Sequence, residues 1–310
     1  MLIRLGYVAL SKTIDITSSK TITYTNYLKD NNIEKIDELI IENLKNLKEI
    51  LIYNIKNNIH FFRITSKLIP LATKKDVEFE YIEKYKKYFD EIKELIIKYN
   101  LRIDAHPDQF AVLNSTNKEV RENTIEILKY HYNILKALGI KNKIIILHVG
   151  SSVLGKENSI KRFINNFNKL PLYLKECIAL ENDDKIYNIE DVLKICKELS
   201  ISCVLDYHHH ICNHENIDLD FNKIFKTWKK MTPKIHFSSP KSMTKKDFRS
   251  HNDYINSFDF INFIKKVKNL NYNLDIMLEA KAKDEALFKL VRELKYKTDY
   301  KFVDETSFIV

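Results

Sequence analysis

The stretch VLDYHHHICNH (residues 204–214) carries a short apolar run into one aspartate and four histidines. It holds four of the ten histidines of the chain. A short apolar run that turns polar at its end is typical of a buried strand, here one that ends at Asp206. Carboxylate and imidazole groups are common ligands of divalent metals. The stretch therefore predicts a strand that leads into a metal site.

Along the whole chain, short β-prone runs alternate with longer amphipathic stretches. We predict strands at residues 2–7, 59–66, 101–106, 143–149, 177–182, 203–206, 234–237 and 274–279. We predict helices at residues 36–57, 79–99, 120–138, 159–174, 189–199, 219–229, 255–267 and 283–294. Eight such units predict a parallel sheet covered by helices. Their number fits a single-domain (β/α)8 TIM barrel over residues 1–310, with a doubly wound open sheet as the alternative.

The bulk composition narrows the class of protein. The chain has 310 residues, 45% of them hydrophobic, which is enough to bury a large core. No run approaches the roughly 18 apolar residues of a membrane helix, and the start MLIRLGYVAL lacks the features of a signal peptide. We therefore expect a cytoplasmic, nucleoid-associated protein with no membrane partner. The four cysteines occur singly, which argues against a zinc ribbon or a disulfide framework.

The net charge of +9 fits an anionic partner such as nucleic acid. A coding bias toward Lys, Asn and Ile would produce the same excess of positive charge. Charge by itself therefore leaves both interpretations open.

Nearly every predicted strand ends in a side chain that can bind metal. These residues are His106, His148, Glu181, Asp206, His236 and Glu279. The C-terminal ends of the strands in a βα barrel open at one mouth, so residues distant in sequence are expected to share one pocket. A single histidine at a strand end is commonly only hydrogen-bonded. Several carboxylates and imidazoles desolvated together without a cation would be costly.

The types of ligand narrow the metal. Imidazole and carboxylate without thiolate suit Mn²⁺, Fe²⁺ or Zn²⁺ better than Mg²⁺, which prefers oxygen ligands. The candidates outnumber the ligands of one ion, so we expect a multinuclear site. Such sites commonly hydrolyse phosphate esters.

Two assignments stay open on the sequence pattern. Strict alternation would put Asp206, His208 and His210 on one face, but the strand ends there, so the inward histidine is not fixed. Lys234 lies two residues before His236 and would share its face. It is a solvated bystander, a deprotonated amine or a carboxylated lysine, and the residues alone favour the bystander.

Eight motifs in order resemble those of the UV damage endonuclease family, whose members incise DNA on the 5′ side of UV photoproducts and other lesions with a TIM-type barrel. They are IRLGY (3–7), AHPDQF (105–110), ILHVGS (146–151), LEND (180–183), LDYHHH (205–210), KIHFS (234–238), HNDYI (251–255) and LEAKAKDEAL (278–287). The resemblance implies a metal-dependent hydrolase acting on damaged double-stranded DNA. Attack at the phosphate 5′ to the lesion would leave a 3′-OH and a 5′-phosphate, and we expect a monomer.

The resemblance also implies roles for particular residues. The implied metal ligands are His106, His148, Glu181, Asp206, His209, His236, His251 and Glu279. They would hold two or three ions, with Mn²⁺ first and Zn²⁺ or Mg²⁺ as alternatives. The residues expected to be catalytic are Glu279, Glu181, His236 and Lys234. The resemblance makes Lys234 a suspected N6-carboxylysine, which reverses the bystander interpretation.

Four further residues resemble those that contact DNA in the family. Gln109 and Phe110 correspond to a pair that probes the distorted duplex, with Phe110 where a tyrosine is more familiar. Tyr7 matches an aromatic near the scissile strand, and Ser11 stands where an asparagine is usual. The alternative for Gln109 and Phe110 is a loop turn with a core-facing phenylalanine. His131 is expected to pack in the interior or to support the ligands.

Two other enzyme classes place metal ligands at the strand ends of a barrel, namely abasic-site endonucleases and sugar isomerases. The pair Gln109 and Phe110, together with Lys234, favours the damage endonuclease over both. A nucleic-acid-binding protein with structural metals is a third alternative. It is disfavoured because structural sites are usually closed and have fewer ligands.

Overall fold

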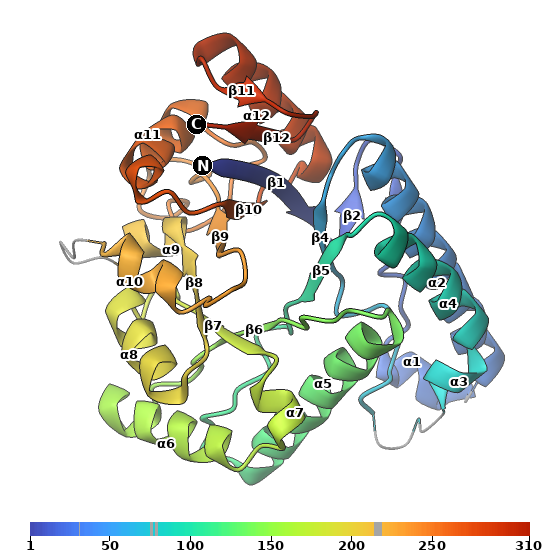
Figure 1. The fold of residues 1–310 in the computed structure, drawn as a ribbon. Coiled ribbons are helices and arrows are strands. Elements are labelled where there is room, and N and C mark those ends of the chain that lie inside the picture. The colour runs from blue at the N-terminus through green and yellow to red at the C-terminus, as the bar shows by residue number, and fades with distance from the viewer. Residues whose placement is uncertain (31, 75–76, 78–79, 214–218) are drawn as a thin grey trace.

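Eight parallel strands form a closed ring in this computed structural model, which describes residues 1–30, 32–74, 77, 80–213 and 219–310 (Figure 1). The ring runs in the order β1 (Leu2–Val8), β4 (Phe61–Ile64), β5 (Arg102–Ala105), β6 (Ile145–His148), β7 (Ile178–Glu181), β8 (Ser202–Asp206), β9 (Lys234–Phe237) and β10 (Leu274–Leu278). β10 pairs back onto β1, with Ile3 opposite Leu274. The predicted (β/α)8 barrel is therefore confirmed, and the open sheet is excluded.

Helices surround the ring of strands on its outside (Figure 1). The principal ones are α2 (Ile33–Lys56), α4 (Lys86–Lys98), α5 (Lys118–Ala137), α6 (Lys156–Asn168), α8 (Ile189–Leu199), α10 (Phe221–Lys226), α11 (Ser257–Val267) and α12 (Lys283–Lys297). Each of the eight predicted helical segments overlaps one of them. Within the described residues, no helix has the length and apolar content needed to cross a bilayer.

Helix α8 shows how the sequence sets a helix. The Asn188 side chain accepts hydrogen bonds from the backbone N–H groups of Glu190 and Asp191, and the Asp191 carboxylate accepts from the Asn188 N–H. This capping box satisfies N–H groups that the first turn leaves free. Val192 and Cys196 lie four residues apart and face the barrel, where both are buried.

Several short elements were not predicted. They are the hairpin β2 (Leu10–Ser11) and β3 (Ile16–Thr17), the helices α1 (Tyr24–Asp30), α9 (Tyr207–Cys212) and η1 (Lys268–Leu270), and the strands β11 (Lys301–Phe302) and β12 (Ser307–Ile309). The short helices α3 (Tyr81–Lys84) and α7 (Leu172–Lys175) overlap the helices predicted at 79–99 and 159–174. The predicted helix at 159–174 is interrupted before Pro171, which has no N–H to continue it. β12 pairs antiparallel with the start of β1, so the two chain ends lie together (Figure 1).

Candidate metal centre at the barrel mouth

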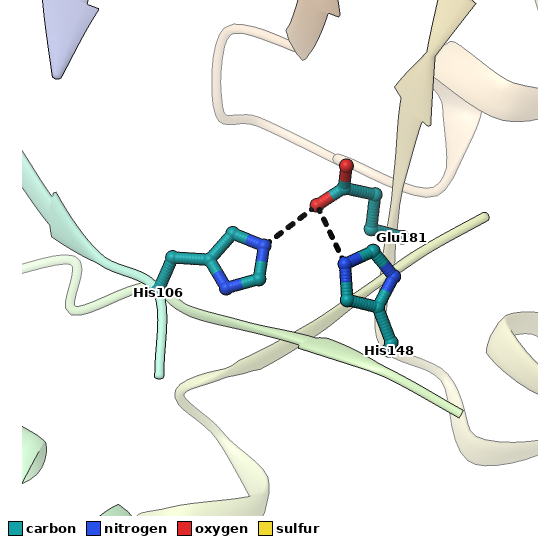
Figure 2. Close-up of side chains that lie close together, drawn as sticks. All are labelled: His106, His148 and Glu181. Atoms are coloured by element: carbon teal, nitrogen blue, oxygen red, sulfur yellow. Dashed lines mark hydrogen bonds and ion pairs between the residues drawn. The ribbon is translucent and has the colours of Figure 1, made fainter. Parts of the chain in front are cut away.

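The strand-end residues converge on Glu181, which is buried at the end of β7. His106 donates a hydrogen bond from Nε2 to Glu181 Oε2 at 2.9 Å, and His148 Nε2 lies 3.9 Å from the same oxygen. Figure 2 shows both imidazole rings pointing at this carboxylate, His106 from the segment after β5 and His148 from the end of β6. On its other side, His236 Nδ1 lies 3.0 Å from Glu181 Oε1. Residues up to 130 positions apart thus meet at one carboxylate.

Two groups of three side chains have ligand atoms close enough to hold an ion. One consists of His106, His148 and Glu181, and the other of Glu181, Asp206 and His236. Within each group the ligand atoms lie within 4.8 Å of one another. Glu181 belongs to both groups.

The remaining predicted ligands lie around these two groups. Glu279 Oε1 lies 3.4 Å from His236 Nδ1. His209 Nδ1 lies 3.6 Å from Glu181 Oε1 and 3.7 Å from Asp206 Oδ2. The ring centroid of His251 lies 6.1 Å from that of His209, at the edge of the cluster. The eight predicted ligands are therefore gathered in one place, although ligation itself stays a prediction.

A short helix, rather than a continued strand, decides which histidine turns inward. Asp206 caps α9, because its Oδ1 accepts a hydrogen bond from the backbone N–H of His209 at 2.7 Å. A residue three positions after the cap lies back over it on a helix. His208 instead packs near His251, and His210 near Tyr207. The fourth histidine of the stretch, residue 214, lies outside the described residues.

Buried polar atoms in the cluster support a cation. Within the described residues, Asp206 Oδ2 and His236 Nδ1 are buried and accept or donate no hydrogen bond. A buried polar atom without a partner costs free energy, and a cation coordinated by such an oxygen or nitrogen removes that cost. The donor set of imidazoles and carboxylates therefore fits a divalent metal.

Electrostatics keep Glu181, His148 and His236 in states that can bind metal. Burial alone would raise the pKa of Glu181, but the charges of His236 and His148 and the hydrogen bond from His106 hold it well below its usual value. Burial lowers the pKa of both His148 and His236. Ionised carboxylate and neutral imidazole are the forms that coordinate metal. His209 differs, because burial is outweighed by Asp206 and other carboxylates and its pKa rises to about 9.

Lys234 is fully buried inside the barrel, and its Nζ lies beside the carboxylate of Asp104. The interpretation as a solvated bystander is therefore wrong. Burial, with the positive charges of Arg102 and Arg63, holds the pKa of Lys234 well below its usual value. Arg63 was not predicted: it donates to Glu279 Oε1 at 2.5 Å and also to His236. A charged residue inside the apolar run FFRI (61–64) was the available signal.

The residues expected to contact DNA fall into two kinds. Gln109 is exposed, and Phe110 is 73% exposed in the loop after β5, so the core-facing alternative is wrong. A cavity of about 770 Å³ lies beside the pair, and His131 is among its lining residues. His131 is buried against Tyr130, and burial lowers its pKa to about 3, so it is a neutral packing residue.

Tyr7 and Ser11 are buried rather than exposed. The Tyr7 hydroxyl donates to Asn54 Oδ1 at 2.7 Å, and the Ser11 hydroxyl donates to Asp284 Oδ2 at 2.6 Å. Asp284 also accepts from the backbone N–H of Lys12 at 2.6 Å. The two bonds to Asp284 anchor the β2–β3 hairpin to α12, whereas the bond from Tyr7 joins β1 to α2.

Three comparisons with known proteins point to one family. The family model described as UV-endonuclease UvdE matches residues 3–307. A UV DNA damage endonuclease of Bacillus mycoides (strain KBAB4) is 41% identical over 304 residues, covering 95% of each chain. Another, of Bacillus cereus (strain B4264), is 42% identical with the same coverage. The crystal structure of SacUVDE matches with a TM-score of 0.87 at 35% identity, covering 95% of this chain and 98% of that chain.

Proposed function

Since the chain belongs to the UV-endonuclease UvdE family, and is thereby a nuclease that acts on DNA, we propose that it cuts duplex DNA on the 5′ side of UV photoproducts and other helix-distorting lesions. The observation that carries the proposal is the gathering of imidazoles and carboxylates around Glu181 at the barrel mouth. A site of this composition, open at the mouth of a barrel, suits hydrolysis of a phosphodiester. We further propose a monomer that works in the cytoplasm at the nucleoid.

The proposed metal ligands are His106, His148, Glu181, Asp206, His209, His236, His251 and Glu279. They would hold two or three divalent ions, most favourably Mn²⁺, with Zn²⁺ or Mg²⁺ as alternatives. When bound, such ions supply Lewis-acid activation of water and neutralise charge at the leaving oxygen. Glu181 sets the spacing of the two groups, and Asp206 is held in place by the backbone of α9. Hydrolysis in which the 3′ oxygen departs from phosphorus would leave a 3′-OH on one fragment and a 5′-phosphate on the other.

The catalytic residues proposed are Glu279, Glu181, His236 and Lys234. Arg63 fixes Glu279 and His236 relative to each other, since it donates a hydrogen bond to both. For Lys234 we propose carboxylation: its neutral amine adds CO₂, an N–C bond forms at Nζ, and one proton is released to solvent. The resulting anion would lie beside the positive charges of Arg63 and Arg102. Before the reaction, the same charges lower the pKa of Lys234 and so favour the neutral amine that reacts with CO₂.

Lesion recognition would rely on Phe110 and Gln109. A lesion weakens stacking and pairing, so extruding the damaged nucleotides costs less free energy than extruding intact ones. The exposed ring of Phe110 can fill the gap, and stacking on a base is worth roughly 1–3 kcal/mol. That range favours the opened state of a damaged duplex without forcing an intact one open. Tyr7 would lie near the scissile strand from β1, and Ser11 would act on it through the hairpin that its bond to Asp284 anchors.

An incision assay tests the proposal. The protein with Mn²⁺ is incubated with end-labelled duplexes that carry a pyrimidine photoproduct, an abasic site or no lesion. We expect a nick on the 5′ side of the photoproduct whose 3′ end a polymerase can extend, and no nick in the intact duplex. Glu181→Gln should abolish nicking, whereas Glu198→Gln, at an exposed position of α8, should not.

Two outcomes would contradict the proposal. Incision at the abasic site alone would identify an abasic-site endonuclease. Retention of damaged duplex without incision under any divalent metal would identify a binding protein with structural ions.

A further inference from the structure

The loop between β9 and α11 (residues 238–256) follows the C-terminal end of β9, at the mouth of the barrel, and carries its own hydrogen bonds. Its two arms pair with each other, because Lys241 N–H donates to the Ser250 carbonyl at 2.7 Å and Asn252 N–H donates to the Ser239 carbonyl at 2.8 Å. Pro240 and His251 form a β-bridge between these bonds. The loop is therefore tied at its base to His251, at the edge of the cluster.

The tip of this loop carries an exposed apolar side chain. Met243 is 81% exposed, and the hydroxyls of its neighbours Ser242 and Thr244 hydrogen-bond to each other at 2.8 Å. The Thr244 carbonyl accepts from Phe248 N–H at 2.9 Å, which closes the turn after the tip. Phe248 packs toward His208, with ring centroids 5.8 Å apart. Met243 is thus held out into solvent by an internally bonded loop.

Positive charge surrounds Met243. Lys245 and Lys246 are exposed, and within the described chain neither forms an ion pair. Lys241 and Arg249 are paired, with Asp247 at 3.4 Å and with Asp184 at 3.3 Å. A single exposed methionine is ordinary on a protein surface. Here the exposed methionine lies beside two unpaired lysines at the rim of a nuclease site. This combination suits duplex DNA, which offers charged phosphates to the lysines and a groove with an apolar floor to the methionine.

The topology places this tip across the cluster from Phe110. Loops that follow strands all lie at the C-terminal end of the barrel. β9 is four strands away from β5 in the ring of eight, so the loops after these strands rise on opposite sides of the mouth (Figure 1). A duplex lying across the metal cluster therefore meets Phe110 on one side and Met243 on the other.

We propose that this loop is a second DNA contact, in which Met243 enters the minor groove as an apolar wedge and Lys245 and Lys246 neutralise the flanking phosphates. Proteins that kink DNA use apolar side chains in this way. Two contacts on opposite sides of the cluster would hold the duplex bent over it, and a lesion lowers the cost of that bend. The inference rests on the proposed function, because it takes duplex DNA as the occupant.

The lysines are tested by the salt dependence of binding. Fluorescence anisotropy with a labelled intact duplex gives the dissociation constant over a range of NaCl concentrations, in the presence of Mn²⁺ and without any need for incision. Each lost phosphate contact lowers the slope of log K against log salt by about 0.9. The double variant Lys245→Ala/Lys246→Ala should therefore lose about 1.8 in slope. The matched control Lys136→Ala/Lys141→Ala, at the opposite end of the barrel, should keep the slope of the wild type.

The methionine is tested by Met243→Ala, with Tyr296→Ala as its control. Tyr296 is 90% exposed in the last turn of α12. Removing a side chain that becomes buried in the groove should weaken binding of a photoproduct duplex about tenfold. The control should bind as the wild type does.

The failures can be told apart. If the wild type nicks damaged DNA but the loop variants behave as their controls do, this inference is wrong and the proposed function stands. If the wild type nicks nothing while the lysine variant still loses slope, the proposed function is wrong and the DNA contact stands. If Met243→Ala instead breaks up a dimer seen by light scattering and leaves DNA binding unchanged, the tip is a self-association surface and the inference is overturned.

Discussion

Glu181→Gln removes the one side chain that both candidate ion groups share. The carboxylate lies 2.9 Å from His106 and 3.0 Å from His236, and it is buried. The amide keeps the shape of the side chain but carries no charge and offers one oxygen instead of two. Each group then has two full donors left out of three. We expect the loss of metal affinity to reach at least the upper end of the roughly 10–100-fold range known for residues that only support ligands.

The size of the effect follows from linkage. At about 100 times Kd, a bound ion stabilises the folded protein by about 2.7 kcal/mol. For 310 residues, about 2.1 cal/mol/K per residue gives an unfolding entropy near 0.65 kcal/mol/K. Mn²⁺ should therefore raise the Tm of the wild type by about 4 °C. A 100-fold loss of affinity leaves about 0.4 kcal/mol, a shift below about 1 °C.

Differential scanning calorimetry with and without Mn²⁺ measures both shifts, after removal of metal with a chelator. Glu198→Gln, on the outer face of α8, serves as the control and should keep the full shift. A Glu181→Gln protein that is folded and still shows the wild-type shift would refute the shared-carboxylate arrangement.

Two further predictions concern recognition and stability. Phe110→Ala should weaken binding of a photoproduct duplex by about 1–3 kcal/mol in anisotropy titrations and leave an intact duplex unaffected; equal losses for both would contradict a probing role. Asp275→Asn should lower the free energy of unfolding in urea by about 3 kcal/mol at neutral pH, because the buried carboxylate pairs with Arg4 and Arg102. Burial alone would raise the pKa of Asp275, but these arginines lower it. The stability that the ionised Asp275 carboxylate contributes is therefore complete above its pKa in the unfolded chain, about 3.9. It is lost as the pH falls through the lower pKa of Asp275 in the folded protein. The difference in stability between variant and wild type should therefore narrow in acid.

The sequence was sufficient to predict the barrel, because the pattern of each strand and each helix lies within a short stretch of residues. Each strand is a short apolar run, and most of these runs end at a residue such as His148 or Glu181 that is conspicuous after apolar neighbours. The C-terminal ends of parallel strands must meet, so the cluster followed from the order of elements.

Features that depend on distant partners were not accessible in this way. The choice of His209 depends on where β8 stops and α9 begins, which the Asp206 cap decides. Ser11 is buried because Asp284, 273 residues later, accepts its hydroxyl. Arg63 finds Glu279 across 216 residues. No local periodicity encodes such pairs, because they arise only when the ring closes.

Anomalous X-ray diffraction from crystals of the wild-type protein grown with Mn²⁺ tests the central claim most directly. The account predicts one peak among His106, His148 and Glu181, and a second among Glu181, Asp206 and His236. Manganese bound only elsewhere on the protein, or absent from the mouth at saturating concentration, would contradict it.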